Sequence, residues 1–144
     1  MATRPFIRLA ILVAILGGTA AGCGSGKPAL SPVHGKVTFR GTPLPCGTIV
    51  FTPDSSRGHR GALARSEIQA DGSYSLRTES GYGAIPGWYR VTVMAVEMPE
   101  APPPGQRYLV PRSLLPEKYR DPELAGLVRE VKVGGENVIH FVLE

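Results

Sequence analysis

The chain is dominated by short runs in which apolar and polar residues alternate, each run ending at a Gly or Pro turn. The clearest run is "WYRVTVMAVE" at residues 88–97, in which Tyr89, Val91, Val93 and Ala95 fall on one face. A period of two is the spacing of side chains on one face of a β-strand. This run therefore predicts a strand that buries those four side chains.

The same alternation recurs along the rest of the chain. Asp71-Gly72 stands in the middle of residues 62–78, "ALARSEIQADGSYSLRT". Asp-Gly between alternating segments is a strong signal for a hairpin turn. A further strand is expected at residues 127–133. The remaining residues predicted to face the core are Val37, Phe39, Ile49, Phe51, Ile68, Ala70, Tyr74, Leu76, Ile139, Phe141 and Leu143.

The spacing of these runs favours one all-β domain. Gly and Pro together account for 32 of the 144 residues, which is typical of a β protein with many turns. About seven short strands, each bounded by turn signals and without a helical pattern between them, predict an antiparallel β-sandwich. A chain of this length suits a single domain.

The N-terminal 22 residues have the pattern of a signal peptide. Arg4 and Arg8 precede the apolar run "LAILVAIL" at residues 9–16, and small residues follow as far as Cys23. The apolar run has eight residues, whereas a membrane-spanning helix needs about 20. The pattern therefore indicates export and cleavage, and its length argues against a spanning helix.

The residues up to and including Cys23, "AAGC", resemble the lipobox of bacterial lipoproteins. The resemblance implies that the Cys23 thiol carries diacylglycerol and that Cys23 becomes the first residue after cleavage. Acyl chains would anchor the protein to a membrane of the bacterial cell envelope. Gly24 replaces the Asp that signals inner-membrane retention in enterobacterial lipoproteins, which favours the outer membrane. Ordinary secretion with cleavage nearby is the alternative.

The predicted organisation has three parts. Residues 1–22 form the lipoprotein signal peptide, residues 23–32 the lipidated N-terminus and a Gly/Ser/Pro linker, and residues 33–144 the β-sandwich. A flexible linker of this length spans on the order of 15–20 Å. The sandwich is therefore expected to sit close to the bilayer.

Five stretches in order resemble bacterial lipoproteins with a carboxypeptidase-regulatory-like domain, and the resemblance covers residues 31–144. It implies a transthyretin-like, or prealbumin-like, sandwich without inherent activity, which in carboxypeptidases is an accessory to a separate catalytic domain. The stretches are "PVHGKVTFRGTPLPCGTIVFTP", "QADGSYSLRT", "GAIPGWYRVTV", "LLPEKYRDPE" and "VKVGGENVIHFVLE".

The sequence contains no recognisable catalytic or cofactor-binding motif. His34, His59 and His140 are too dispersed for a metal-ligand spacing, and we expect all three to be polar surface residues. A nucleophile elbow is absent as well. The net charge of +4 comes from scattered basic residues, which does not indicate nucleic-acid binding. We therefore expect neither an enzyme nor a cofactor.

The second cysteine, Cys46, has no disulfide partner within the chain if Cys23 is lipidated. It lies in "PLPCGTIV" at the start of a predicted strand, with no Lys or His close in sequence to activate a thiol. We therefore expect Cys46 to act as a small buried apolar residue.

Trp88 and Tyr82 are the candidate binding residues. Trp88 alternates with Arg90 and should face outward, and Tyr82 lies in the glycine-rich segment just before it. Exposed aromatic rings can stack on sugars or on an apolar patch of a partner. Alternatively, Trp88 covers an edge of the sandwich beneath the proline-rich stretch 98–122. That stretch could itself be a recognition element or a guard against strand aggregation.

These observations favour a non-catalytic, membrane-anchored envelope lipoprotein that binds an envelope protein or a polysaccharide. The alternative is a purely structural envelope component that associates with itself through edge strands. A third and weaker hypothesis is a small hydrolase or metal-binding protein. The sequence does not name the partner.

Overall fold

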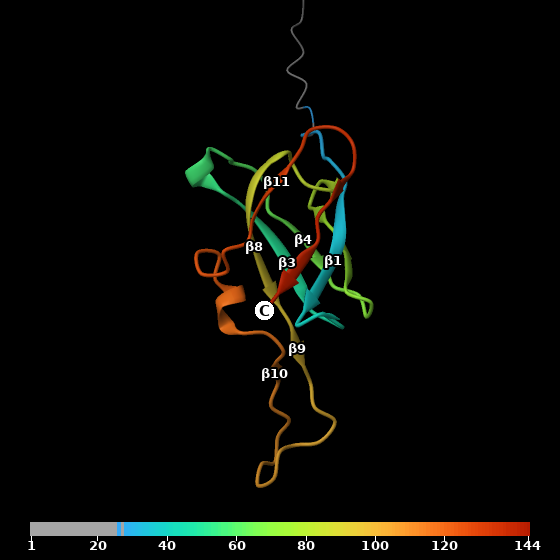
Figure 1. The fold of residues 1–144 in the computed structure, drawn as a ribbon, viewed down its shortest axis with the longest axis vertical. Helices are drawn as coiled ribbons and strands as arrows, with labels where there is room; N and C mark the ends of the chain where they lie inside the picture. The colour runs from blue at the N-terminus through green and yellow to red at the C-terminus, as the bar shows by residue number, and fades with distance from the viewer. Residues whose placement is uncertain (1–25, 27) are drawn as a thin grey trace, which may run out of the picture.

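The computed structural model describes residue 26 and residues 28–144, which form an all-β fold (Figure 1). The predicted signal peptide, residues 1–22, and the predicted lipidation at Cys23 lie outside the described residues. The described chain contains more and shorter strands than the seven predicted, and several have only two residues.

The larger sheet has six strands, and each neighbouring pair is antiparallel. The run of alternating residues at 88–97 supplies its longest strand, which pairs on both sides. In order across the sheet, the strands are β11 (Val128–Val131), β8 (Gly87–Met94), β3 (Thr48–Pro53), β4 (Ala64–Glu67), β6 (Arg77–Thr78) and β7 (Gly81–Tyr82).

The second sheet is built around β1 and contains two parallel pairings that the sequence did not predict. β12 and β13 run parallel to β1, while β5 and β2 run antiparallel to it. Side chains alternate with a period of two in both arrangements, so the pattern of apolar residues cannot distinguish them. The strands are β1 (Val33–Phe39), β2 (Thr42–Pro43), β5 (Ser73–Ser75), β12 (Asn137–Val138) and β13 (Phe141–Leu143).

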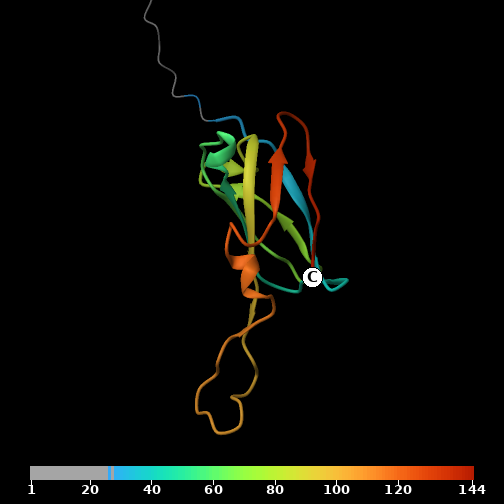
Figure 2. The same cartoon turned by 60° about the vertical axis from the view of Figure 1, so that its left-hand side comes forward.

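The two sheets pack in a β-sandwich-like arrangement with a continuous core between them (Figure 2). Phe51 lies at the centre of an aromatic cluster, its ring centroid 5.8 Å from that of Tyr89, 5.9 Å from Phe141 and 6.3 Å from Tyr74. The four residues predicted to face inward at 88–97 are each at most 1% exposed, which confirms the predicted face; three lie in β8, and Ala95 directly follows it.

The predicted hairpin around Asp71-Gly72 is present, but the two sheets share its return strand. The backbone N–H of Gln69 donates to the carbonyl of Ser73 at 2.9 Å, and Arg65 pairs with Arg77 farther from the turn. Between these points, β5 pairs with β1 instead of β4. Ala70, predicted to face the core, is exposed because it lies in the turn.

A long hairpin projects from one end of the sandwich (Figures 1 and 2). Its strands β9 (Val96–Glu97) and β10 (Arg112–Ser113) flank the loop 98–111, and we refer to residues 96–113 as the arm. At its tip, the backbone N–H of Gln106 donates to the carbonyl of Pro103 at 3.0 Å. Residues 28–32 lie at the opposite end of the sandwich (Figure 1).

The helical segments of the described residues are two 3-10 turns, η1 (Ser55–Arg57) and η2 (Glu117–Arg120). Tyr119 of η2 is buried, and its hydroxyl lies 2.9 Å from both the backbone N and O of Glu144. This contact holds the return from the arm against the end of β13. Within the described part of the chain, no helix is long and apolar enough to span a bilayer.

Candidate functional site

Trp88 and Tyr82 both face outward from the six-stranded sheet, but they do not form a pair. Trp88 is half-buried in β8, with the Arg57 guanidinium 4.6 Å from its ring centroid. Tyr82 is 77% exposed in β7, with the Arg77 guanidinium 5.5 Å from its ring centroid. Three strands lie between β8 and β7, so about 4.8 Å per strand separates the rings by roughly 19 Å.

The alternative interpretation places Trp88 beneath the proline-rich stretch 98–122, which includes most of the arm. The arm leaves the sandwich beyond Met94, at the other end of β8 from Trp88 (Figure 1). The group that covers the Trp88 ring is the Arg57 side chain, which follows Asp54 in the η1 turn. Trp88 is thus part of a polar cluster on this face, and Tyr82 is the aromatic residue that is open to a ligand.

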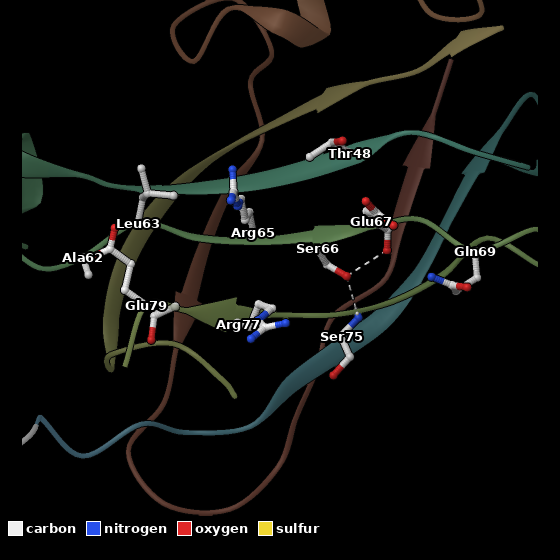
Figure 3. A pocket seen from close by; sticks show the side chains of 11 residues that line it. Thr48, Ala62, Leu63, Arg65, Ser66, Glu67, Gln69, Ser75, Arg77 and Glu79 are labelled. Atoms are coloured by element: carbon white, nitrogen blue, oxygen red, sulfur yellow. Dashed lines mark hydrogen bonds between the residues drawn. The ribbon is translucent and has the colours of Figure 1, made fainter. Parts of the chain in front are cut away.

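A groove of about 1010 Å³ lies over β4 and β6 (Figure 3). Tyr82 does not line it, but it stands opposite the lining residue Arg77 in the register of β6 and β7. In Figure 3, β4 carries Arg65, Ser66 and Glu67, with Thr48 of β3 on one side and Arg77 on the other. The polar side chains that line this groove include Thr48, Arg65, Glu67, Gln69, Arg77 and Glu79.

The groove opens where the two strands of the Asp71-Gly72 hairpin separate. Arg65 and Arg77 form the one register pair between β4 and β6. Nearer the turn, the Ser66 hydroxyl takes the place of a backbone partner, because the backbone N–H of Ser75 donates to Ser66 Oγ at 3.1 Å. Residues 73–78 thus pair first with β1 and then with β4, which leaves a gap beside β4 that polar side chains surround.

The charged side chains of the groove are available for a ligand. Among the described residues, Arg65, Glu67, Arg77 and Glu79 take part in no ion pair. Arg65 and Arg77 stand directly opposite each other on the outer face. Like charges at directly opposed positions of an antiparallel pair are destabilising. The groove therefore concentrates unpaired donors and acceptors on an otherwise well-packed sheet.

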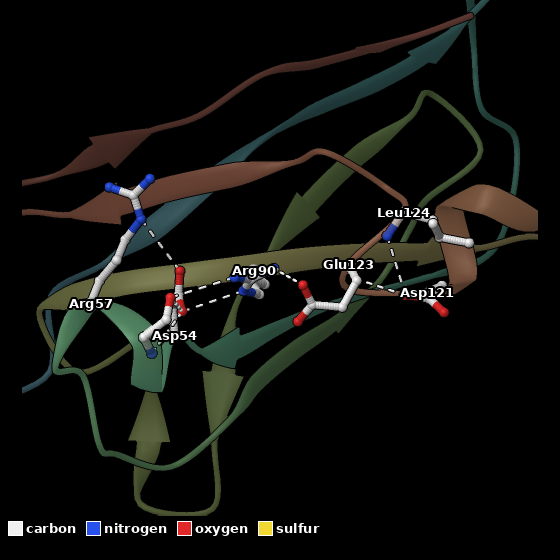
Figure 4. Close-up of polar contacts among 7 residues, drawn as sticks. Asp54, Arg57, Arg90, Asp121, Glu123 and Leu124 are labelled. Atoms are coloured by element: carbon white, nitrogen blue, oxygen red, sulfur yellow. Dashed lines mark hydrogen bonds and ion pairs between the residues drawn. The ribbon is translucent and has the colours of Figure 1, made fainter.

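A second polar cluster surrounds Asp54, which is 2% exposed (Figure 4). Its carboxylate accepts from the Ser56 hydroxyl at 2.6 Å and lies 3.3 Å from Arg90 Nε and 3.4 Å from Arg57 Nε. Arg90 Nη1 donates to Glu123 Oε2 at 2.6 Å. The hydrogen bond from Ser56 and then the bond and charge of Arg90 hold the pKa of Asp54 below its ordinary value.

The Asp54 cluster has a structural role. Asp54 caps the η1 turn by accepting from the backbone N–H of Ser56. Arg90 links this turn to Glu123, which belongs to the segment between η2 and β11. Two connections thus fasten to the outer face of β8. The dipeptide Asp54-Ser55 weakly predicted a turn at this place, since Asp followed by Ser is common in turns. Nothing in the sequence predicted the contacts of Asp54 with Arg90 or of Arg90 with Glu123.

His59 is the histidine whose environment the sequence did not predict. It is half-buried, and its ring centroid lies 4.7 Å from that of Tyr89. Burial lowers the pKa of His59, and it raises the pKa of Tyr89 to about 12. A Cβ atom at Gly87 would lie 2.3 Å from His59 Nδ1, so Gly87 leaves the room for this ring. The expectation of a surface histidine was wrong here.

The other two histidines lie toward the outside of the second sheet. His34 Nδ1 is 3.4 Å from Glu136 Oε1, and His140 Nδ1 accepts from the backbone N–H of Lys36 at 3.0 Å. Within the described residues, no three His, Cys, Asp or Glu side chains gather as metal ligands would.

Cys46 is half-buried, not fully buried as predicted. Its Sγ lies 3.7 Å from the carbonyl oxygen of Val96, at the base of the arm. Gly47 beside it has φ of +135° and packs so closely on Met94 that a Cβ would lie 2.5 Å from the Met94 carbonyl oxygen. The start of β3 is therefore fixed against the end of β8, and Cys46 borders that contact.

Comparison with protein-family models, with curated proteins and with solved structures gives no match to this chain. The candidate site therefore rests on its own geometry. That geometry offers a polar groove with an exposed aromatic ring at its border, and a separate apolar arm.

Proposed function

We propose that the protein is a non-catalytic lipoprotein of the bacterial cell envelope that presents the arm to a partner protein. The N-terminal sequence up to Cys23 supports the lipid anchor and favours the outer membrane. The all-β fold agrees with the resemblance to lipoproteins with a transthyretin-like domain, which implies no inherent catalytic activity.

The observation that carries this proposal is the exposure of apolar side chains along the arm. Met98, Tyr108, Leu109 and Val110 are between 43% and 81% exposed. Several exposed apolar side chains on one segment are typical of an interaction site. Three successive prolines at 102–104 restrict the loop, so less conformational entropy is lost when a partner binds.

The position of the arm agrees with an anchored protein. Residues 28–32 lie at one end of the sandwich and the arm at the other (Figure 1). A lipid at Cys23 would hold the first end near the bilayer, because the linker is short. The arm would then point away from that membrane, toward a partner in the adjoining space.

Crosslinking in native membranes tests the proposal. A photoreactive amino acid replaces Tyr108 in the arm or, as the control, Lys132, which is exposed on the sandwich. We expect a defined crosslinked product from position 108 that position 132 does not give. Mass spectrometry of the N-terminal peptide should show the acyl groups on Cys23. An unmodified Cys23, or equal products from both positions, would contradict the proposal.

A second candidate function is self-association through the edge of the smaller sheet. β12 and β13 each pair with β1 on one side, and Val138 of β12 and Val142 of β13 are 54% and 72% exposed. An edge strand with exposed β-branched residues is a template for strand pairing. Sedimentation of the detergent-solubilised protein tests this candidate. We expect a dimer that Val142→Lys dissociates if it is correct, and a monomer at every concentration if it is not.

A further inference from the structure

We infer that the groove over β4 and β6 binds an acidic oligosaccharide, with a sugar carboxylate between Arg65 and Arg77 and a sugar ring stacked on Tyr82. This site lies on the six-stranded sheet, and neither the arm nor residues 28–32 line it. Thr48 and Glu67 at one end of the groove lie near Val96 at the base of the arm, and Leu30 approaches Gly81 beside Tyr82. The groove is nevertheless distinct from the arm, which we propose binds a partner protein.

The charge of the ligand follows from the opposed arginines. Arg65 and Arg77 are both exposed, stand at the same register position of β4 and β6, and have no ion-pair partner among the described residues. Each guanidinium repels the other until an anion lies between them. Because a guanidinium binds a carboxylate through two parallel hydrogen bonds, this pair suits a carboxylate.

The acceptors of the groove suit a ligand that also carries hydroxyl groups. Glu67 and Glu79 line the groove next to the two arginines, and an ionised carboxylate only accepts hydrogen bonds. A simple anion has no donors for them. The hydroxyl groups of a sugar are donors as well as acceptors, and Thr48 and Gln69 can bond to either kind of group. A uronic acid unites both requirements in one residue.

The exposed aromatic ring provides the apolar contact that a sugar ring needs. Tyr82 is directly opposite Arg77 in the register of β6 and β7. The Arg77 guanidinium lies over the Tyr82 ring, yet the side chain is 77% exposed. The free area of the ring can stack on the C–H face of a sugar. The volume of the groove, about 1010 Å³, is that of a large ligand site.

Titration with tetragalacturonate tests the inference on the detergent-solubilised full-length protein. Calorimetry should give one binding site, and NMR shifts should concentrate on residues of β4, β6 and β7. Arg77→Gln should weaken binding at least tenfold, because it removes a charge-assisted pair of hydrogen bonds. Arg107→Gln removes the same charge from the exposed arm and should leave the affinity unchanged within twofold.

The aromatic contact has its own matched control. Tyr82→Ala should weaken tetragalacturonate binding about fivefold to tenfold, because it removes the stacked ring. Tyr108→Ala removes a ring of similar exposure, 81%, from the arm and should have no effect. Since all four substituted side chains are exposed, circular dichroism should show all four variants to be folded.

Three results would overturn the inference. The first is the absence of binding at millimolar tetragalacturonate. The second is equally tight binding of cellotetraose, which has no carboxylate. The third is equally effective competition by inorganic phosphate, which would show that the arginines recognise any anion. Because none of these results involves the arm or Cys23, they leave the proposed lipoprotein function intact, and failed crosslinking would leave the groove site intact.

Discussion

The sandwich core and the arm contain similar kinds of side chains in opposite environments. Phe51, Tyr74, Tyr89 and Phe141 are at most 3% exposed, whereas the apolar residues in the loop of the arm are at least 43% exposed. Apolar area removed from water stabilises the fold by about 25 cal/mol per Å². Burial of the core side chains therefore stabilises the fold. The apolar area of the arm stays exposed, so its burial would stabilise a complex with another molecule instead.

Replacing one aromatic residue in each region should give the largest difference in the free energy of unfolding. Phe51→Ala should lower the free energy of unfolding by about 3–5 kcal/mol, because it leaves a cavity at the centre of the aromatic cluster. Tyr108→Ala should change it by less than about 0.5 kcal/mol, because an exposed ring loses little on truncation. Urea unfolding followed by circular dichroism measures both. A large effect at Tyr108 would mean that the arm packs on the sandwich.

Alanine substitutions at one glycine of the sandwich and one of the arm should also differ in their effect on stability, here through steric overlap. A Cβ at Gly35 would lie 1.8 Å from the carbonyl oxygen of Ile139, so Gly35→Ala must push β1 away from the C-terminal strand. Such overpacking should cost about 2–3 kcal/mol. Gly105→Ala meets open space and is opposed only by its φ of +85°, which should cost about 1 kcal/mol. Thermal and urea unfolding of the two variants tests this order.

Acid should weaken the sandwich through Asp54, which fastens two connections to it. The pKa of Asp54 is below its unfolded value of 3.8, so the carboxylate stabilises the folded state above that pH. This stability is lost as the pH falls below 3.8 through the folded pKa. In unfolding measurements between pH 6 and pH 2, Asp54→Asn should flatten the acid end of the curve. Glu100→Gln, on the arm, is the control of equal charge change, and an unaltered slope in Asp54→Asn would contradict the prediction.

The smallest expected effect is a gain in stability. Arg65→Gln relieves the repulsion between opposed guanidinium groups and should raise the free energy of unfolding by about 0.2–1 kcal/mol. The same variant should lose tetragalacturonate binding. Arg107→Gln in the arm is the control and should change neither quantity. A destabilised Arg65→Gln protein would show that Arg65 supports the fold instead of a ligand.

The candidate site depends on contacts between distant segments, which the pattern of the sequence could not predict. For Tyr82 the sequence predicted only a place in the glycine-rich segment, whereas the structure has it in β7. Alternation correctly placed Trp88 on an outer face, because a local period of two fixes the face of a strand. It could not place these two residues relative to each other, since β3, β4 and β6 come between their strands. The same limit hid the contacts of Asp54 with Arg90 and of His59 with Tyr89. Each joins segments whose separation in the sequence carries no periodic signal.

The sequence by itself determined the local structure: the inward residues of β8, the turn at Asp71-Gly72 and the all-β character of the described chain. Backbone conformation and side-chain alternation depend on near neighbours, so a short stretch of sequence specifies them. Tertiary structure alone decided the parallel course of β13 beside β1, the groove between Arg65 and Arg77, and the projection of the arm. These features depend on which strands pair across the whole chain, and many pairings satisfy the same alternation.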